Sequence, residues 1–460
     1  MLFWKIVFNN MMKKRLWAVA AASMLIFVCL PVSGQTYAVT DGVLSLTLDE
    51  AIQLALDENP TIKVADEDIR LKEMAKLETT MSLLPEANLS GSYQRTIKKQ
   101  TMVMNGMEFK VGIENSYNGG LSVSLPVFAP ALYKSMQLTR TDVELAVETA
   151  RQSRQDLVNQ VTKAYFQLML AQDSYVVLQK SMAQAEDNFR IVNAKFEQGR
   201  VSEYDKISAE VQMRNLQPTV ISARNAVDLS KLQLKVLMGV TADVDVAVNG
   251  QLADYEEDMY VGLLSEEDLS LSGNTTLHQL DLSSQLLRNT LAMQKQSFAP
   301  NIALQFNYMY TCMADNFEFS NYNWNPYANV ALSVSVPIFR YSNFSNVKKT
   351  RVQMNQLQLN RDYTERQLHM QLDTYLNNMK ASAEQISSNK EAIIQATKGR
   401  DIAQTLYDVG RGTVLELNSA EVALTQSRLT YSQSIFDYLS AKADLDKLLG
   451  RDYISENEKQ

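Results

Sequence analysis

One octapeptide is written twice in this chain, at a separation of 211 residues. LSVSLPVF at 121–128 returns at 332–339 as LSVSVPIF, with six of its eight positions identical. The same offset, or one of 215 residues, relates four further pairs of segments: LLPEANLSGSY (83–93) and FAPNIALQFNY (298–308), Gly199-Arg200 and Gly410-Arg411, Ser208–Val211 and Ser419–Val422, and LKVLMG (234–239) and LDKLLG (445–450). A nearly fixed spacing over so many segments indicates a duplicated unit. We therefore predict two copies of one unit, each reading helix, strand, strand, long helix, second helix.

The segments around the octapeptides predict β-strands, because apolar residues alternate there with small polar ones. In 330–338, Val330, Leu332 and Val334 point one way and Ser333 and Ser335 the other. The predicted strands are 87–97, 118–126, 302–311 and 328–338. Strands of about nine to eleven residues can cross a bilayer when tilted. A water-soluble β-sandwich shows the same alternation, so the strands alone leave both readings open.

The helical segments favour the membrane reading. We predict helices at 61–83, 131–198, 203–238, 276–298, 342–409 and 414–449. Residues 131–198 contain neither Gly nor Pro and carry an apolar seam at steps of four and three. Each of the two longest helices would measure about 100 Å, and a short helix stacked on a return helix would measure about 89 Å. Each repeat then makes two parallel rods of similar length, with a pair of strands at one end.

Neither the rods nor the strands are complete within one chain. A rod this long buries only one or two faces, and four strands cannot close a barrel whose edges would otherwise meet lipid. Both defects indicate oligomerisation. Three chains would supply twelve strands, with their rods forming a helical tube beneath. The predicted fold class is mainly α-helical, with a membrane β-barrel completed by a homotrimer.

The N-terminus is predicted to be a signal peptide over residues 1–34. MMKKRLW supplies a basic segment, AVAAASMLIFVCL a short apolar run, and Val32 and Gly34 the small residues of a cleavage site. A membrane anchor is the alternative, although the run is short for a transmembrane helix. Met12 is an alternative start to Met1. The context of Cys29 does not favour lipidation.

The composition excludes several classes of function. The net charge is −8, so a nucleic-acid-binding surface is not expected. The chain has only two His, His278 and His369, and two Cys, Cys29 and Cys312, which is a poor inventory for a metal site or a His-based catalytic centre. We therefore expect no enzyme activity, no catalytic residue, no metal and no cofactor.

The ordered motifs resemble those of the TolC-like outer-membrane efflux channels over nearly all of the mature chain. The motifs are LTLDEAIQLALDENPTI (46–62), the strand segments ending in Pro126 and Pro337, and the tips FEQGRVSEYDKISAE (196–210) and YDVGRGTVLELNSAE (407–421). The resemblance implies an outer-membrane channel with a periplasmic tunnel. It also implies a periplasmic adaptor protein and an inner-membrane pump as partners, with the resistance-nodulation-division class as the first expectation for the pump.

The resemblance also assigns roles at the two hairpin tips. The residues that would meet the adaptor are Gly199, Arg200, Val201, Ser202, Gly410, Arg411, Gly412 and Thr413. Asp205 and Glu416 would line the tunnel mouth, and Tyr407 would lock it by donating a hydrogen bond to Asp205. The chain departs from the family pattern at Ser419, where a second acid is common. It also departs at Gly412, because the tip arginine is one position early, at Arg411.

The predicted domain organisation follows from the repeats. It comprises the signal peptide (1–34), a first repeat (35–239), a connecting segment (240–275), a second repeat (276–450) and a C-terminal tail (451–460). The loops at 98–117 and 311–327 should face the cell exterior.

The alternative function is a trimeric coiled-coil adhesion protein with a barrel anchor. Strand pairs interleaved twice with hairpins disfavour it, because an adhesin needs one anchor at one end of the chain.

Overall fold

The computed structural model describes residues 39–40, 43–104, 106–241, 244–256, 269–317 and 322–453. The predicted signal peptide, with both candidate start residues and Cys29, lies outside these residues. Parts of the connecting segment and most of the C-terminal tail lie outside them as well. The chain divides at Ser45 into two units. The described part of the first contains the pairing of β1 (Val39–Thr40) with β2 (Val43–Leu46), in which Val39 lies opposite Leu44.

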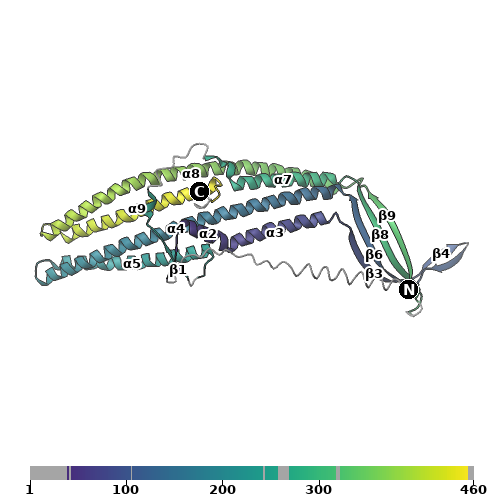
Figure 1. The fold of residues 1–460 in the computed structure, drawn as a ribbon, viewed down its shortest axis with the longest axis horizontal. Coiled ribbons are helices and arrows are strands. Elements are labelled where there is room, and N and C mark those ends of the chain that lie inside the picture. The colour runs from purple at the N-terminus through teal and green to yellow at the C-terminus, as the bar shows by residue number, and fades with distance from the viewer. Residues whose placement is uncertain are drawn as a thin grey trace. The chain divides into compact units, whose positions relative to one another are not determined.

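The second unit begins at Leu46 and contains both repeats (Figure 1). Its first repeat contains α2 (Leu48–Glu58), α3 (Pro60–Met81), β3 (Glu86–Arg95), β4 (Gln100–Met104), β5 (Met107–Val111), β6 (Asn115–Phe128), α4 (Pro130–Glu197) and α5 (Glu203–Met238). The connecting segment contributes β7 (Asp245–Val248), η1 (Leu252–Tyr255) and η3 (Leu271–Gly273). The second repeat contains α7 (Thr275–Gln296), β8 (Asn301–Ala314), β9 (Asn325–Ser335), α8 (Tyr341–Asp408) and α9 (Val414–Leu448).

The helices pair as the lengths predict. Both long helices, α4 and α8, contain 68 residues. The short helix of each repeat packs beside one half of the long helix, and the return helix packs beside the other half (Figure 1). The repeats join through α4, which contacts both α7 and α9. No described helix has an apolar stretch long enough to span a membrane.

The four long strands form one antiparallel sheet in the order β3-β6-β8-β9. Tyr93 pairs with Tyr117, which pairs with Cys312, and Leu121 pairs with Tyr308, which pairs with Ala328. This register places most apolar residues of the four strands on one face and the small polar residues, such as Ser90, on the other, where Met309 and Tyr327 are apolar exceptions. An apolar outer face and a polar inner face are typical of a membrane barrel. Within the described chain, the outer edges of β3 and β9 have no partner strand.

The hairpin of β4 and β5 lies within the segment that the sequence analysis treated as a loop. Gln100 pairs with Val111, and Met104 pairs with Met107. Gly106 lies just before β5 with a φ of 82°, and the sequence at 105–106 is Asn-Gly. Asn-Gly favours the tight turn of a two-residue hairpin because both positions accept positive φ. This signal was present in the sequence and was missed.

Two equivalent asparagines connect the short helices to the return helices. Asn59 Nδ2 donates to the Leu237 carbonyl at 2.7 Å, and Asn274 Nδ2 donates to the Leu448 carbonyl at 2.7 Å. The oxygen of each side chain also caps the helix that follows, accepting from the Thr61 and Leu277 amides respectively. Both asparagines are buried. A single buried amide therefore ends one helix and begins the next in each repeat, which stacks the two helices end to end.

A glycine makes each of these junctions possible. Gly239 and Gly450 follow the return helices with φ of 69°. A Cβ on Gly239 would lie 2.9 Å from the Glu58 carbonyl oxygen, and one on Gly450 would overlap the Gly273 carbonyl. The two chain segments can therefore approach only where the side chain is a hydrogen atom.

We expect Gly450→Ala to destabilise the protein more than Gly410→Ala. Both glycines have positive φ, which costs other residues about 1–2 kcal/mol. Only Gly450 faces another backbone, because a Cβ on Gly410 would have nothing within 4 Å. The overlap should add about 1–3 kcal/mol. Thermal unfolding of the detergent-solubilised variants, followed by circular dichroism, measures the difference. Equal midpoints would contradict this account of the junction.

Candidate functional site

The two hairpin tips end their long helices in the same way. Gly199 has φ of 67° and Gly410 has φ of 77°. The Gly199 and Arg200 amides donate to the carbonyls of Phe196 at 2.8 Å and Lys195 at 2.9 Å. At the second tip, the Gly410 amide donates to Tyr407 and the Arg411 amide to Leu406. These paired bonds are a Schellman motif, in which a left-handed glycine satisfies the last free carbonyls of the helix.

The return helices begin with capping boxes that contain both predicted gate acids. The Asp205 carboxylate accepts from the Ser202 hydroxyl at 2.7 Å and from its amide at 3.2 Å. The Glu416 carboxylate accepts from the Thr413 amide at 2.8 Å and from its hydroxyl at 3.0 Å. The pKa of Glu416 is lowered, mainly because its carboxylate accepts a hydrogen bond from the Thr413 backbone amide. Each acid therefore has a local structural role, because it satisfies an otherwise free amide at a helix start.

A small apolar cluster brings the two tips together. Its buried members come from four helices: Val192 of α4, Ala209 of α5, Tyr407 of α8, and Val414 and Leu417 of α9. The tip residue Val201 packs against this cluster. The structure therefore places the predicted lock residue, Tyr407, at the contact between the two hairpins.

The predicted hydrogen bond from Tyr407 to Asp205 is not made in this structure. The Tyr407 hydroxyl is buried and has no hydrogen-bond partner among the described residues. The Lys195 ammonium lies 4.2 Å from the centre of the Tyr407 ring. Burial, with a smaller contribution from the negative charge of Asp205, raises the pKa of Tyr407. The Tyr407 hydroxyl is thus a buried hydrogen-bond donor near Asp205. The Asp205 carboxylate accepts from Ser202 of its own capping box instead.

The departures from the family pattern have local explanations. A Cβ on Gly412 would lie 3.0 Å from the Tyr407 backbone nitrogen and 3.1 Å from the Leu406 Cβ, so a side chain there would crowd the helix end. Ser419 is exposed, and its hydroxyl donates to the Leu415 carbonyl of its own helix. Arg411 is exposed and takes part in the Schellman motif only through its amide.

An ion pair above the second tip was not identified from the sequence. Arg400 Nε lies 3.8 Å from Glu421 Oε1 and 3.3 Å from Asp401 Oδ1. Arg400 Nε and Glu421 Oε1 are buried without a hydrogen bond. Burial raises the pKa of Glu421, against the opposing effect of Arg400 and Arg428. Glu421 belongs to the repeated Ser-Ala-Glu-Val motif, but the motif gives no sign that Glu421 is partly buried.

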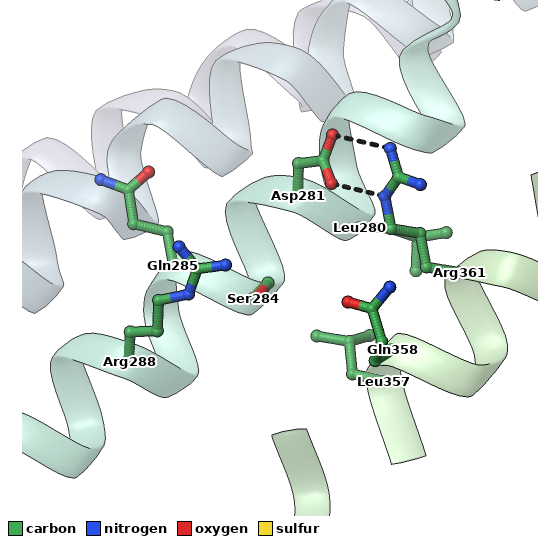
Figure 2. A pocket seen from close by; sticks show the side chains of 8 residues that line it. All are labelled: Leu280, Asp281, Ser284, Gln285, Arg288, Leu357, Gln358 and Arg361. Carbon is green, nitrogen blue, oxygen red and sulfur yellow. Dashed lines mark hydrogen bonds and ion pairs between the residues drawn. The ribbon is translucent and has the colours of Figure 1, made fainter. Parts of the chain in front are cut away.

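Two grooves between the helices contain charged side chains that pair with each other. A groove of about 460 Å³ lies between α7 and α8. Within it, Arg361 Nε lies 2.7 Å from Asp281 Oδ1 (Figure 2), and Arg361 Nη1 lies 3.0 Å from Glu365 Oε2 of the same helix. A second groove, of about 760 Å³, lies between α2, α4 and α9, and there Arg151 pairs with Asp452. Among the described residues, no group of three or more His, Cys, Asp or Glu side chains is placed to hold a metal ion.

The comparisons with known proteins identify a family. The family described as outer membrane efflux protein matches residues 51–240 and 268–451. The outer membrane protein TolC of Escherichia coli (strain K12) is 23% identical over 424 residues, covering 88% of this chain and 82% of that protein. TolC of Vibrio cholerae (serotype O1) is 19% identical, covering 80% and 82%.

Solved structures share the fold. A structure of CusC superposes with a TM-score of 0.73 at 17% identity, covering 88% of this chain and 92% of that one. The Campylobacter jejuni CmeC outer membrane channel gives 0.73 at 16% identity, covering 90% and 88%. The open state of the Neisseria gonorrhoeae MtrE outer membrane channel gives 0.70 at 17% identity, covering 88% of each.

We expect Glu421→Gln to raise thermal stability at neutral pH and to have no effect near pH 4. A carboxyl whose pKa is raised in the folded state opposes folding above that pKa, and the penalty disappears below the unfolded value. The stabilisation by Gln should therefore be largest at pH 7 and should shrink as the pH falls towards 4.5.

Glu210→Gln is the matched control. Glu210 occupies the equivalent position of the first repeat and pairs with Arg214 at 2.7 Å. Exposed ion pairs contribute about 0–1 kcal/mol, so this variant should be neutral or slightly destabilised at pH 7. The midpoint of thermal unfolding measured from pH 4 to 8 tests the pair. A Glu421→Gln variant less stable than the parent at pH 7 would contradict the account.

Proposed function

Because the chain belongs to the outer membrane efflux protein family, we propose that its hairpin tips bind a periplasmic adaptor protein and that its tunnel drains an inner-membrane pump. The protein is an efflux channel of the bacterial outer membrane with a helical tunnel in the periplasm, and it is not an enzyme. Channels of this family are homotrimers that work in tripartite efflux systems. We propose a pump of the resistance-nodulation-division class as the partner and passive conduction of small molecules.

The adaptor proposal is supported by the exposure of both hairpin tips and by their shared sequence motif. Both present a glycine, an arginine and a capping residue in the same order, on the same Schellman and capping motifs. Arg200 and Arg411 are exposed, and only their amides are needed for the fold. A trimer would therefore present six basic tips on similar backbones. A repeated rigid surface is suited to a partner that itself binds as repeated copies.

We further propose that Tyr407, Asp205 and Glu416 control the tunnel mouth. In a trimer each acid becomes a ring of three, and clustered carboxylates attract cations and repel anions. The buried Tyr407 hydroxyl lacks an acceptor in this structure. In the closed channel it would donate to Asp205, and the bond would be released as the tips separate.

Tyr407→Phe should raise the resting conductance of the channel in a planar bilayer. The lost hydrogen bond to a carboxylate is worth about 1.5–3 kcal/mol, and three such bonds act on one aperture. Asp205→Asn should also raise the resting conductance, because it removes the negative charge that strengthens the hydrogen bond from Tyr407. Its side-chain oxygen can still accept from Ser202, so the capping box should be preserved. Glu416→Gln should instead weaken cation selectivity with little effect on opening.

Tyr204→Phe is the control for this experiment. Tyr204 adjoins Asp205 and is 67% exposed, so loss of its hydroxyl should leave conductance unchanged. If Tyr407→Phe conducts like the parent while Glu416→Gln opens the channel, the roles of lock and filter are reversed. If neither variant changes conductance, the constriction lies elsewhere.

Arg200→Glu combined with Arg411→Glu should abolish efflux in the native host while preserving the bilayer conductance. The substitutions reverse the charge of the tips without touching the caps, so they should block docking of the adaptor and leave the channel intact. Susceptibility to a panel of dyes, detergents and antibiotics, compared with a strain lacking the protein, gives the measurement.

Arg224→Glu is the matched charge reversal. Arg224 is exposed on α5, about 32 Å from the start of the return helix. This variant should retain full resistance. Resistance retained by the double variant at the tips would contradict the proposed adaptor site.

A further inference from the structure

The groove between α2, α4 and α9 combines an apolar floor with a charged rim. Its volume is about 760 Å³. The floor is made by apolar side chains of all three helices: Ile52, Leu56, Val158, Phe166, Leu439 and Ala443. The Phe166 ring meets the Tyr255 ring edge to face, with the ring centres 5.1 Å apart, and closes one end of the groove. A concave site of this size, with an apolar floor and a few polar groups, is typical of a small-molecule site.

The charged side chains at the rim of this groove are paired, with one exception. The pairs are Arg151 with Asp452, Arg154 with Asp66, Lys447 with Asp156, Arg451 with Asp446, and Asp49 with the Tyr453 hydroxyl. Lys442 is exposed and has no hydrogen bond or ion pair with any residue that the structure describes. Five basic and three acidic side chains line the groove, so its charge favours an anion. The Lys442 ammonium is the group available to pair with that anion.

A buried hydrogen-bond acceptor in the same groove is also unused. Gln155 is 6% exposed, and its Nε2 donates to Asp452 Oδ1 at 3.0 Å. Its Oε1 has no hydrogen-bond partner within the described part of the chain. A buried acceptor without a donor opposes folding, and such groups are rare in native proteins. A ligand with a hydroxyl or N–H group would supply the missing donor.

The packing of α4 against α9 sets the spacing of these two groups. Two contacts align the helices in antiparallel directions: Asp156 with Lys447 at 2.6 Å, and Asn159 with Asp444 at 3.0 Å. The same alignment places Lys442 level with Val161 of α4. Gln155 therefore lies about 9 Å from Lys442 along the helix axis.

The groove is too far from the sheet to be reached by a bilayer lipid. Arg151, the lining residue of α4 nearest to the sheet, lies about 32 Å along the helix from Pro130, where α4 begins. The polar region of one leaflet is only about 5–8 Å thick. A ligand of this groove must therefore be a free molecule.

We propose that the groove between α2, α4 and α9 binds a free amphipathic carboxylate that carries a hydroxyl or N–H group about 9 Å from its carboxylate. The carboxylate pairs with Lys442, the donor bonds to Gln155 Oε1, and the apolar body lies on the floor between them. Removal of this body from water supplies the driving force, and the two polar contacts supply the selectivity.

The site is separate from the tunnel mouth. Lys442 lies about 42 Å along α9 from Val414, where the return helix begins at the tip. The inference therefore goes beyond the proposed function, because ligand binding here requires neither the adaptor nor the gate.

Three matched ligands test the two polar contacts. A decanoate with a hydroxyl at its far end (ω-hydroxydecanoate) has both polar groups, decanoate lacks the hydroxyl, and decanediol lacks the carboxylate. Calorimetry on the protein in lipid nanodiscs measures binding, and empty nanodiscs correct for partition into lipid. We expect ω-hydroxydecanoate to bind about 2–12-fold more tightly than decanoate and about 10–150-fold more tightly than decanediol.

Two substitutions assign these preferences to residues. Lys442→Gln should abolish the preference for ω-hydroxydecanoate over decanediol and keep its preference over decanoate. Gln155→Met should do the reverse. Each preference is a ratio measured within one protein, so a general loss of stability does not imitate it. Lys398→Gln is the control, because Lys398 is also exposed but lies on α8 outside the groove, and it should keep both preferences.

A cysteine on the floor of the groove locates the bound ligand. Saturating ω-hydroxydecanoate should protect Ala443→Cys from a maleimide, because the ligand body covers this position. Gln433→Cys, at an exposed position of α9 outside the groove, should react equally with and without ligand. Cys312 is 1% exposed and should not react in the folded protein.

Each outcome decides the proposal. Loss of one preference in each variant, with protection of Ala443→Cys alone, supports it. Absence of saturable binding to the parent overturns it, and so do preferences that survive both substitutions. If ligand binds only after removal of residues 454–460, the groove belongs to that segment of the chain, and the small-molecule site is overturned. Conductance of the parent in a planar bilayer tests the proposed channel separately, so failure of one proposal is distinguishable from failure of the other.

Discussion

The unpaired edges of the four-stranded sheet are the constraint on which the rest of the structure depends. The order β3-β6-β8-β9 leaves one edge of β3 and one of β9 without a partner in the described chain. In lipid such edges cannot remain, because their amides and carbonyls have no water to bond. Closure by further copies follows, and channels of this family are homotrimers. One requirement of the membrane thus determines the oligomer, and the oligomer determines how the periplasmic rods are buried.

The two repeats use the same helix junction to build the rods beneath this sheet. The buried Asn59 and Asn274 build the same helix junction twice, and Gly239 and Gly450 let the backbones approach there. The two repeats also contact each other at the tips, through the apolar cluster of Val192, Ala209, Tyr407, Val414 and Leu417.

The hairpin tips combine structural and functional demands in the same residues. Asp205 and Glu416 cap their helices, and they are also the acids that we propose to line the tunnel mouth. Replacing either acid by Ala would remove the helix cap and the charge at the tunnel mouth together. Asp205→Asn and Glu416→Gln remove the charge and keep an oxygen for the cap, so they test the role of the charge alone. Tyr407 differs in this respect, because its buried hydroxyl makes no hydrogen bond in this structure.

The sequence alone determined the parts of this protein that repeat locally. The predicted helix bounds agree with the structure to within two residues, because periodic apolar seams and glycine caps are short-range signals. The fold class and family were predicted correctly from the doubled motifs. The hairpin of β4 and β5 was missed, although its Asn-Gly turn was legible. Only the tertiary structure revealed that Glu421 is partly buried beside Arg400 and that Tyr407 packs between both hairpins. These features depend on which helix faces lie against each other, and contacts between separate helices leave no local pattern in the chain.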